Sequence, residues 1–325
     1  MDIAVIGAGG WGTTLANLLA EKGHKVKLWA HEKEVVDEIN DKKENSGFLP
    51  GIELSSNLEA TDILEDAIKG IGFIVTVVPS SFLRSVAKEI SKYVLDGAIV
   101  VSATKGIEEV SFKRMSEILE DELGDVKIAA LSGPNHAEEV SKKTPTATVI
   151  ASKHQDILDN IKEVFETSYF KVYPHSDIVG IEICGAIKNI TAIAVGVCDS
   201  LKVGDNAKAS IITLGLMEMS NVGKFFGAKR STFYGLAGVG DLVATCTSKH
   251  SRNRAVGEMI AQGKDFDAIK EEMHGMVAEG IKTTKAVYDL AKKNDIDLPL
   301  TKQVYNVIYE KKELKKAIKD LIALI

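Results

Sequence analysis

Apolar runs alternate with amphipathic stretches along the first half of the chain. The runs fall at residues 2–6, 25–30, 73–78, 98–103 and 127–132, and two similar stretches follow at 146–151 and 170–173. Short continuous apolar runs are typical of buried strands, and most of the intervening segments have the three- and four-residue spacing of amphipathic helices. Strands that alternate with helices in this way predict a parallel sheet covered by helices.

The pattern changes after Pro174. From Ser176 onward apolar residues recur at three- and four-residue spacing, and glycine-rich turns interrupt them. This spacing predicts helices and no strands. A chain of 325 residues also exceeds the size at which one hydrophobic core usually stops growing. We therefore expect an α/β protein with an N-terminal Rossmann-like parallel-sheet domain at residues 1–175 and an all-α C-terminal domain at residues 176–325.

One segment, residues 178–198, is long and apolar enough to be mistaken for a membrane span. It contains Glu182, Lys188 and Asn189 among many glycines and alanines. A charge at the centre of a membrane helix costs about 2.5–3.5 kcal/mol, whereas each aliphatic residue contributes only about 0.3–0.6 kcal/mol. The sum does not favour insertion, so we expect no transmembrane segment and a buried helix inside a globular protein.

Composition narrows the class of protein further. With a net charge of −6, the chain lacks the basic surface that nucleic-acid binding needs, so nucleic acid is not an expected partner. Cys184, Cys198 and Cys246 have neither the spacing of a metal site nor that of a disulfide framework, so we expect reduced core thiols and no metal. The first predicted strand begins at residue 2, with no charged leader ahead of it, and we expect a cytoplasmic location.

The first predicted strand runs directly into a glycine-rich turn, Gly-Ala-Gly-Gly-Trp-Gly, at residues 7–12. A strand that ends in G-x-G-x-x-G and opens a helix is the signature of a phosphate cradle. Gly7 permits the tight turn, Gly9 lets the backbone approach a pyrophosphate, and Gly12 lets the helix pack closely on the strand. The turn therefore predicts a dinucleotide site, with a purely structural turn as the alternative.

The end of the second predicted strand bears on the choice of cofactor. An NAD-preferring site usually places an acidic residue there, about 20 residues beyond the glycines, to hold the ribose hydroxyls. His31 occupies this place and Glu32 follows it. His31 is suited to face a 2′-phosphate, although it can also be an exposed residue at a helix start, and Glu32 argues for NAD if it points inward. The sequence leans mildly to NADP.

Lys188 lies in the apolar stretch after residue 178. At helical spacing it shares a face with Ile181, Cys184, Gly185 and Ala192, so its ammonium lies on a predominantly apolar stripe. Desolvation there lowers the pKa of a lysine from its free value of about 10.4. Such a lysine can donate a proton to an oxygen that becomes an alkoxide. The alternative is a lysine whose stem packs while its head reaches water.

Further polar motifs lie in turn-like settings. They are Ser-Ala-Thr-Lys-Gly at 102–106, Ser-Gly-Pro-Asn-His-Ala at 132–137, Gly-Leu-Ala-Gly-Val-Gly-Asp-Leu at 235–242, Ser-Lys-His-Ser-Arg-Asn at 248–253 and Val-Ala-Glu-Gly at 277–280. In an open parallel sheet, ligands bind beyond the carboxyl ends of the strands, where Lys105 and Gly133 are expected. The guanidinium of Arg252 and the amide of Asn253 suit a phosphate group.

Taken in order, these motifs resemble those of bacterial NAD(P)-dependent glycerol-3-phosphate dehydrogenases. The matching set is GAGGWGTTLA, LPG, VVPS, SATKGIE, SGPNHAEEV, GAIKNI, GLAGVGDLVATC, SRN and VAEG, and it runs from residue 3 to about residue 285. The resemblance implies an NADP- or NAD-dependent reduction of dihydroxyacetone phosphate to sn-glycerol 3-phosphate, which feeds phospholipid synthesis. It also implies a dinucleotide-binding first domain and a substrate-binding second domain. The oligomeric state is open, with a homodimer as the candidate.

The resemblance assigns roles residue by residue. It gives Lys188 the acid/base role, and we expect Asp241 to orient or charge-balance this lysine. The residues on the substrate side are Lys105, Gly133, Asn135, Lys188, Asp241, Ser251, Arg252 and Asn253. The residues on the cofactor side, including the glycine turn, are Gly7, Gly9, Gly10, Trp11, Gly12, His31, Phe48, Lys105, Ala137, Arg252, Val277 and Glu279.

Alternatives stay open at several of these positions. Asp241 follows a glycine and precedes an apolar run, so it can serve as a helix N-cap alone. Trp11 can be a packing residue, Arg252 an exposed helix residue and Glu279 a solvated surface residue. Two other functions also remain: another dehydrogenase of the same two-domain build that acts on a hydroxy acid or a sugar acid, and a non-catalytic module that senses NAD(P).

Overall fold

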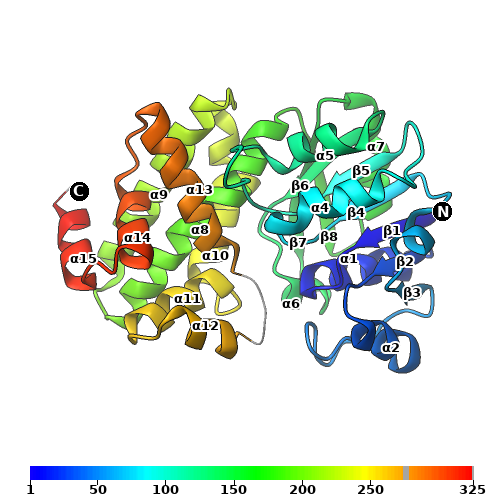
Figure 1. Cartoon of the computed structure of the whole chain (residues 1–325), viewed down its shortest axis with the longest axis horizontal. Coiled ribbons are helices and arrows are strands. Elements are labelled where there is room, and N and C mark those ends of the chain that lie inside the picture. Colours follow the sequence, from blue (N-terminus) through cyan, green and yellow to red (C-terminus); the bar gives the residue numbers. More distant parts are fainter. Residues whose placement is uncertain (274–277, 324–325) are drawn as a thin grey trace. The chain divides into compact units, whose positions relative to one another are not determined.

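The computed structural model describes residues 1–273 and 278–323, and this part of the chain forms two compact units (Figure 1). The first comprises Met1–Thr104 and Met115–Ile178, and the second comprises Lys105–Arg114 and Val179–Ile325. The division therefore falls after Ile178, slightly later than the sequence predicts. Residues 105–114 group with the second unit in this division, whereas the sequence analysis places them in the first domain.

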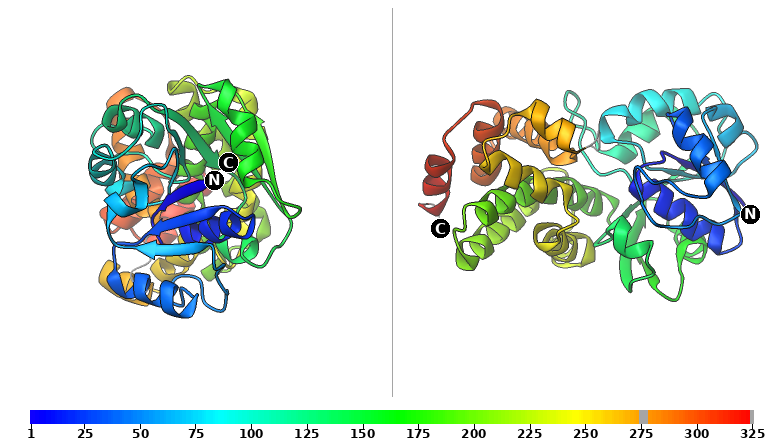
Figure 2. Two further views of the ribbon diagram at one scale, coloured as in Figure 1. Left: turned by 90° about the vertical axis from the view of Figure 1, so that its right-hand side faces the viewer. Right: turned by 90° about the horizontal axis from the view of Figure 1, so that it is seen from below.

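The first unit is built on an eight-stranded sheet with the order β3-β2-β1-β4-β5-β6-β7-β8. The strands are β1 (Asp2–Ile6), β2 (Lys25–Trp29), β3 (Leu58–Thr61), β4 (Phe73–Thr76), β5 (Ile99–Ser102), β6 (Lys127–Ser132), β7 (Thr146–Ser152) and β8 (Phe170–His175). Their arrangement can be followed in Figures 1 and 2. The predicted α/β class is confirmed, and β3 is a strand that the sequence analysis missed.

One strand departs from the parallel pattern. β7 runs antiparallel to β6, while the other neighbouring pairs are parallel. A parallel crossover needs a connection long enough to return along the sheet, usually a helix. Between β6 and β7 the only helix is the short α6 (Ala137–Val140), so the chain reverses instead. The predicted parallel sheet thus contains one antiparallel pair, β6–β7.

Helices cover both faces of this sheet. They are α1 (Gly10–Glu21), α2 (Lys33–Lys42), α3 (Leu64–Ile68), α4 (Ser80–Ile90), α5 (Met115–Leu123) and α7 (Leu158–Phe165), with the short 3₁₀ helix η1 (Gln155–Ile157) before α7. Leu15 of α1 and Phe165 of α7 are fully buried in the core on one face, and Leu83 of α4 and Ile118 of α5 in the core on the other. Each such side chain contributes about 1.5–3 kcal/mol by leaving water.

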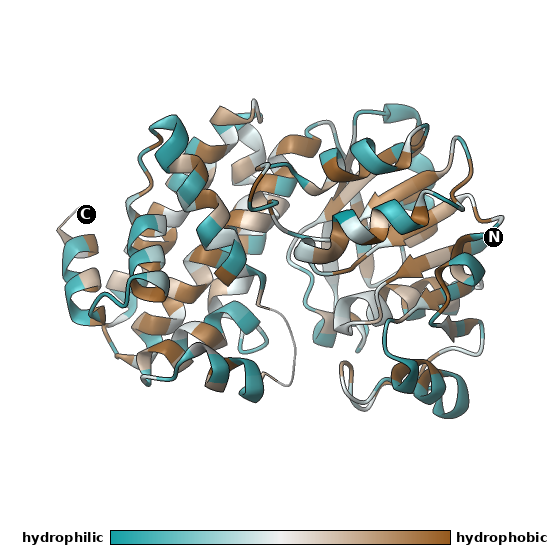
Figure 3. Cartoon of the chain, viewed as in Figure 1, coloured by the Kyte–Doolittle hydropathy of each residue, from teal (hydrophilic) through white to brown (hydrophobic). Residues whose placement is uncertain are grey.

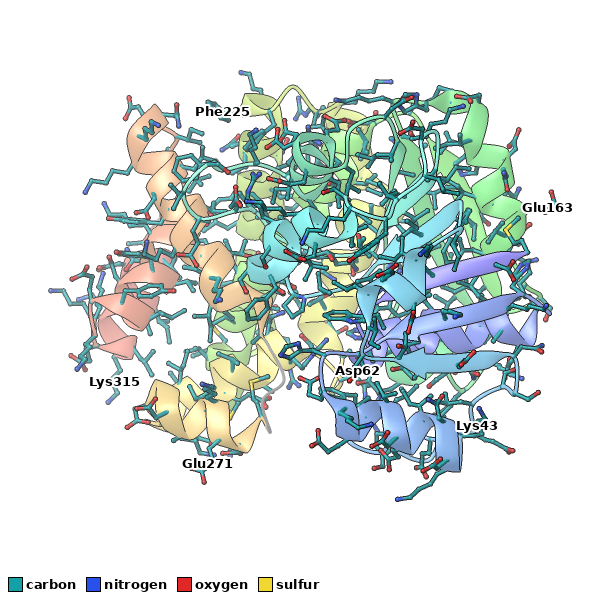
Figure 4. All side chains as sticks on the ribbon, turned by 45° about the vertical axis from the view of Figure 1, so that its right-hand side comes forward. Lys43, Asp62, Glu163, Phe225, Glu271 and Lys315 are labelled. Atoms are coloured by element: carbon teal, nitrogen blue, oxygen red, sulfur yellow. The ribbon has the colours of Figure 1, made fainter. Side chains whose placement is uncertain are left out.

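The hydropathy of the residues follows this layering. In Figure 3 the strands are largely brown, whereas the helices around them carry teal residues. Glu163 on α7 is exposed and projects outward from the first unit, as does Glu271 from its helix in the second unit (Figure 4). Each of these helices therefore packs on the sheet with its apolar face and exposes its polar face to solvent.

The described part of the second unit contains helices and no sheet strand, as the sequence predicts. Its elements are α8 (Ile178–Ser200), α9 (Asp205–Phe225), η2 (Arg230–Tyr234), η3 (Leu236–Gly240), α10 (Asp241–Thr247), α11 (Arg252–Ala261), α12 (Phe266–Glu272), α13 (Glu279–Asn294), α14 (Pro299–Tyr309) and α15 (Leu314–Ile322). Helix α10 follows directly on a single π-helical turn, η3.

Helix α8 is the central helix of this unit. It is the one described helix that is long and apolar enough to cross a membrane, and most of it is buried inside the fold, which confirms the prediction of a buried helix. Small residues let its neighbours approach closely. A Cβ on Gly196 would lie 2.0 Å from the carbonyl oxygen of Arg254, and a Cβ on Gly257 would lie 2.0 Å from that of Ile193. Helices α8 and α11 can therefore cross in contact only because these positions are glycine.

Candidate active site

The glycine turn of the first unit has the shape of a phosphate cradle. A Cβ on Gly12 would lie 1.8 Å from the carbonyl oxygen of Gly7, and one on Gly7, whose φ is +120°, would lie 3.0 Å from the backbone of Val77. Helix α1 begins at Gly10, and its N-cap, Gly9, has no side chain to cover the first N–H groups. A Cβ on Gly9 would meet no atom within 4 Å. This open helix N-terminus fits the pyrophosphate of a dinucleotide.

Two of the predicted cofactor residues lie next to this turn. A Cβ on Gly10 would lie 2.8 Å from the carbonyl oxygen of Phe48 and 3.9 Å from Cβ of Ala137. Trp11 is half-buried, and its ring centroid lies 6.4 Å from that of Phe170. The structure therefore brings Gly10, Phe48 and Ala137 together, while the contact with Phe170 is what the packing alternative predicts for Trp11.

Asn45 is a residue of this region that the sequence analysis missed. It is 1% exposed, and its Nδ2 donates to the carbonyl oxygen of Ala8 and to Oγ1 of Thr13, each at 2.8 Å. A buried amide that bonds to a turn holds the turn in one conformation. No motif around Asn45 indicates this contact, because its partners lie far away in the sequence.

His31 lies just beyond the end of β2, and its ring centroid is 6.2 Å from that of Trp29. The N–H of Gly7 donates to the carbonyl oxygen of Trp29 at 3.0 Å, so this strand end adjoins the glycine turn. Both His31 and Glu32 are exposed. Since either side chain is accessible to a ribose, the geometry does not choose between NAD and NADP.

Gly133 and Asn135 follow β6 at the carboxyl edge of the sheet, where the sequence predicts them. Nδ2 of Asn135 donates to Oγ1 of Thr148 at 3.0 Å, and that hydroxyl donates to the carbonyl oxygen of Ser132 at 3.1 Å. The loop after β6 is thus attached to β7 through Thr148. Both residues belong to the first unit.

The second unit holds a buried cluster of charged groups. Nζ of Lys188 lies 2.5 Å from Oδ1 of Asp241, and Nζ of Lys105 lies 3.1 Å from Oδ2 of the same carboxylate. Lys188 is 6% and Asp241 1% exposed, whereas 18% of the Lys105 side chain is accessible. One carboxylate therefore bridges two ammonium groups, of which the outer one reaches solvent.

The electrostatics of the cluster favour proton transfer. Burial lowers the pKa of Lys188 to about 8, which the charge of Asp241 partly opposes and the charge of Lys105 reinforces. Burial alone would raise the pKa of Asp241, but the charges of Lys105 and Lys188 hold it below its usual range. At neutral pH the site thus holds an ionised carboxylate and an ammonium whose proton leaves readily.

Two alternatives from the sequence are resolved by this geometry. The ammonium of Lys188 does not reach water, because the residue is buried and Asp241 binds its Nζ. Asp241 is not an N-cap, because α10 begins at Asp241 itself and the N-cap is Gly240. The carboxylate is used in the ion pairs instead.

Thr245 completes this cluster and was missed in the sequence. Its Oγ1 accepts a hydrogen bond from Nζ of Lys188 at 2.8 Å and donates to Oδ1 of Asp241 at 3.3 Å. Thr245 follows Asp241 by one helical turn, so both side chains lie on the same face of α10. This spacing is the signal in the sequence that identifies it.

Ser251 and Arg252 lie at the start of α11. Oγ of Ser251 accepts a hydrogen bond from the N–H of Arg254 at 3.3 Å and caps the helix. Arg252 is the first residue of the helix and is exposed. An exposed guanidinium at a helix N-terminus suits a phosphate, although the geometry is also that of an ordinary surface arginine.

Asn253 links three helices. Its Nδ2 donates to Oδ1 of Asn189 on α8 at 2.9 Å, and its Oδ1 accepts from the N–H of Gly280 on α13 at 2.9 Å. Glu279, the first residue of α13, is half-buried. Val277 lies outside the described residues. These contacts give Asn253 a structural role whether or not it also touches a ligand.

No group of three or more His, Cys, Asp or Glu side chains that could hold a metal ion occurs within residues 1–273 and 278–323. The three cysteines are free and buried. Burial raises the pKa of the Cys198 thiol to about 11 and that of Cys246 to about 12, so neither is a thiolate at neutral pH.

Known proteins share these motifs over the whole chain. The family model described as NAD-dependent glycerol-3-phosphate dehydrogenase N-terminus matches residues 2–158, and the corresponding C-terminus model matches residues 177–319. The chain is 47% identical over 325 residues to the glycerol-3-phosphate dehydrogenase (NAD(P)+) of Chlorobium limicola, which covers 99% of this chain and 97% of that protein. The chain belongs to the NAD-dependent glycerol-3-phosphate dehydrogenase family. The protein of the same name from Citrifermentans bemidjiense is 48% identical over 323 residues, 98% of this chain and 96% of that one.

Solved structures of the glycerol-3-phosphate dehydrogenase family have the same fold. The enzyme of Coxiella burnetii superimposes with a TM-score of 0.95 at 39% identity, covering 99% of this chain and 98% of that one. A ketopantoate reductase from Ralstonia eutropha, with a TM-score of 0.63 at 15% identity over 99% of this chain and 100% of that one, shares the fold alone. The predictions that the chain is an oxidoreductase of this family and that its cofactor is NAD or NADP are confirmed. The choice between the two stays a prediction.

Proposed function

We propose that the chain reduces dihydroxyacetone phosphate to sn-glycerol 3-phosphate with NADPH or NADH, reversibly. The observation that carries this proposal is the buried Lys188 ammonium, with a pKa lowered to about 8 by burial, hydrogen bonded to Asp241 and Thr245. Reduction of a ketone needs a proton at the oxygen as well as a hydride at the carbon. Lys188 is a group whose pKa suits that proton transfer near neutral pH.

The glycine turn is the proposed seat of the cofactor. Its tight packing at Gly7 and Gly12 and the open space at Gly9 suit a pyrophosphate at the start of α1. Phe48 and Ala137, which adjoin Gly10, are then placed to contact the nucleotide. When bound, the reduced nicotinamide supplies the hydride to the central carbonyl carbon of the substrate.

Lys188 protonates the oxygen in this proposal. As the carbonyl carbon gains the hydride, negative charge develops on the oxygen, and Nζ of Lys188 gives it a proton. A fixed ammonium near that oxygen stabilises charge that exists only in the transition state, which raises the rate. Asp241 and Thr245 accept hydrogen bonds from the same nitrogen and so orient it. In the reverse direction the neutral amine withdraws the proton.

The phosphate of the substrate is assigned to the start of α11. The guanidinium of Arg252 supplies a planar pair of donors, and the helix N-terminus favours an anion. Lys105, whose ammonium is partly exposed, adds a second cation beside Asp241. Ser251 and Asn253 complete the substrate side proposed for the second unit. Gly133 and Asn135 of the first unit are proposed substrate residues on the resemblance alone.

The proposed product, sn-glycerol 3-phosphate, indicates the metabolic role of the chain. We assign the activity to the supply of sn-glycerol 3-phosphate for glycerophospholipid synthesis in the cytoplasm, with a homodimer as the expected assembly. The three-carbon substrate requires no contact with nucleic acid or with a membrane. Lipid metabolism is therefore the proposed context.

The direct test is oxidation of NADH and of NADPH by the purified chain in the presence of dihydroxyacetone phosphate. We expect turnover with both, faster with NADPH. Turnover with hydroxy acids or sugar acids in place of dihydroxyacetone phosphate favours another dehydrogenase of this build. Cofactor binding without turnover on any of these substrates favours the sensing module.

A further inference from the structure

The segment Lys105–Arg114, called here the 105–114 loop, leaves β5 and returns to α5 but packs in the second unit. Its two ends are joined to each other. Ile107 and Arg114 form an antiparallel bridge, and the N–H of Glu108 donates to the carbonyl oxygen of Lys113 at 3.0 Å. The loop is therefore a short hairpin, and an interaction that fixes one end also fixes the other.

One end of the loop contacts the charged cluster, and the other end contacts helix α8. At one end, Nζ of Lys105 lies 3.1 Å from Oδ2 of Asp241. At the other, Nη1 of Arg114 lies 2.5 Å from Oε2 of Glu182, and these two side chains are only 5% and 4% exposed. Glu182 and Lys188 are carried by the same helix, α8. The Arg114–Glu182 pair thus ties the loop to the helix that carries the proposed proton donor.

Two further contacts of the loop with the second unit are longer and more exposed. Nζ of Lys285 lies 3.8 Å from Oε2 of Glu109 with both side chains about two-fifths exposed, and Nζ of Lys293 lies 5.6 Å from the ring centroid of Phe112. Exposed ion pairs contribute little because water screens them. In contrast, the loss of one partner from a buried guanidinium–carboxylate pair strongly destabilises the fold, because an unpaired charge stays buried. The buried pair is therefore a strong anchor between the loop and α8.

We propose that Arg114 and Glu182 are positioning residues, whose ion pair holds the 105–114 loop on α8 so that the Lys105 ammonium lies against Asp241 beside Lys188. This inference rests on the proposed function, since it gives Lys105 a place in that reaction. Neither residue touches a reacting atom. Their effect reaches the site through the hairpin and through α8.

This arrangement has a consequence for the proton donor. The described groups that face Lys188 are Asp241, Thr245, Lys105 and the neutral thiol of Cys246. The charge of Lys105 helps burial to lower the pKa of Lys188, and Asp241 opposes it. If Lys105 moves away, the pKa of Lys188 rises, and the pH above which ketone reduction fails rises with it.

The test replaces both members of the pair, Arg114→Met with Glu182→Met, because exchanging a buried ion pair for apolar side chains of similar size usually preserves folding. We expect kcat/KM for dihydroxyacetone phosphate to fall about tenfold to a hundredfold, and the alkaline limb of its pH profile to move to higher pH. The matched control is Glu120→Met with Lys153→Met, which removes a 2.8 Å exposed ion pair of the first unit and leaves both quantities unchanged.

A second, milder variant tests the proposal if the double variant does not fold. Arg114→Lys keeps the charge beside Glu182 but loses the planar fork, so we expect a smaller fall in kcat/KM and a smaller move of the limb in the same direction. If the unmodified chain reduces dihydroxyacetone phosphate and the folded variants keep its kcat/KM, or lose activity without a move of the limb, the inference is overturned and the proposed function stands. If the unmodified chain does not reduce this substrate, the proposed function itself is overturned, and the inference with it.

Discussion

Nζ of Lys188 lies 2.5 Å from Oδ1 of Asp241, and both side chains are buried within the helical unit. Burial favours the neutral amine, and the charge of the adjacent carboxylate opposes this by favouring the ammonium. The pair therefore sets the pH range in which Lys188 can give a proton away.

The carboxylate is the first group to test. In Asp241→Asn the charge that raises the pKa of Lys188 is lost, while burial and Lys105 continue to lower it. The pKa of Lys188 then falls further, so less of the ammonium is present at pH 7, and we expect kcat for ketone reduction to fall by a factor of about 100 or more. The alkaline limb of the pH profile moves to lower pH. Asp289→Asn, which removes an exposed partner of Lys285, serves as the control and leaves the profile in place. A limb that stays at its original pH in Asp241→Asn contradicts the assignment.

The pH dependence of the unmodified chain gives a second prediction. Burial lowers the pKa of Lys188 to about 8, and ketone reduction uses the protonated form. The rate of reduction is therefore full below pH 8 and lost as the pH rises above it, whereas the oxidation of sn-glycerol 3-phosphate, which uses the neutral amine, increases over the same range. Steady-state rates in both directions measure this. Two profiles that change in the same sense would rule out a shared acid/base group.

The glycine turn offers a matched pair of variants. A Cβ on Gly9 meets open space, whereas one on Gly12 would lie 1.8 Å from the carbonyl oxygen of Gly7. Gly9→Ala should keep the free energy of unfolding within about 1 kcal/mol and weaken NADPH binding by about tenfold or more. Gly12→Ala should destabilise the first unit itself by about 1–3 kcal/mol. Urea denaturation and fluorescence titration separate the two effects. Unchanged NADPH affinity in Gly9→Ala argues against a pyrophosphate at this turn.

Glu218 of α9 is a buried carboxyl outside the charged cluster. It caps the start of α14: Oε2 accepts hydrogen bonds from the N–H of Thr301 at 3.0 Å and from its hydroxyl at 2.6 Å, and Oε1 accepts from the N–H of Leu300. Burial raises the pKa of Glu218 to about 7 from an ordinary 4.5, although these hydrogen bonds oppose the shift. The folded chain therefore holds this proton more tightly than the unfolded chain does.

Because the pKa of Glu218 is higher in the folded chain than in the unfolded chain, protonation of this side chain stabilises the fold. The contribution of this proton is full below about pH 4.5 and is lost as the pH rises through about 7. The side chain of Glu218→Gln does not titrate. The stability advantage of the unmodified chain over this variant should thus shrink by on the order of 3 kcal/mol across that range. Urea denaturation at several pH values measures it, with the exposed Glu271→Gln as control. An advantage that is constant with pH shows that Glu218 is not held protonated by the fold.

Hydrophobic periodicity predicts most of the sheet but not all of it. Strands such as β4 and β5 are continuous apolar runs and are recognised as such. The short β3, with Glu59 and Thr61 among its few residues, has too weak an apolar signal to be found. The antiparallel direction of β7 also cannot be predicted from the hydrophobic pattern. A strand that is buried on both faces is a continuous apolar run whichever way it runs in the sheet.

Local sequence patterns likewise indicate some residues of the candidate site but not the contacts between residues that lie far apart in the sequence. The apolar helical stripe around Lys188 indicates that this lysine lies among apolar residues, although its acid/base role comes from the family resemblance. Thr245 can be found from the sequence through its four-residue spacing from Asp241. The pair of Arg114 and Glu182 is not, because nothing local to either residue indicates a partner so far along the chain. Contacts of this kind, which bring the 105–114 loop into the helical unit, appear only in the folded structure.

The most direct measurement is kcat for the reduction of dihydroxyacetone phosphate by Lys188→Ala, with NADPH affinity determined on the same preparation. We expect kcat to fall by a factor of about 100 to 10,000, while the dissociation constant of NADPH stays within a few-fold of that of the unmodified chain. A variant that binds NADPH normally and keeps the original kcat would remove Lys188 from the reaction.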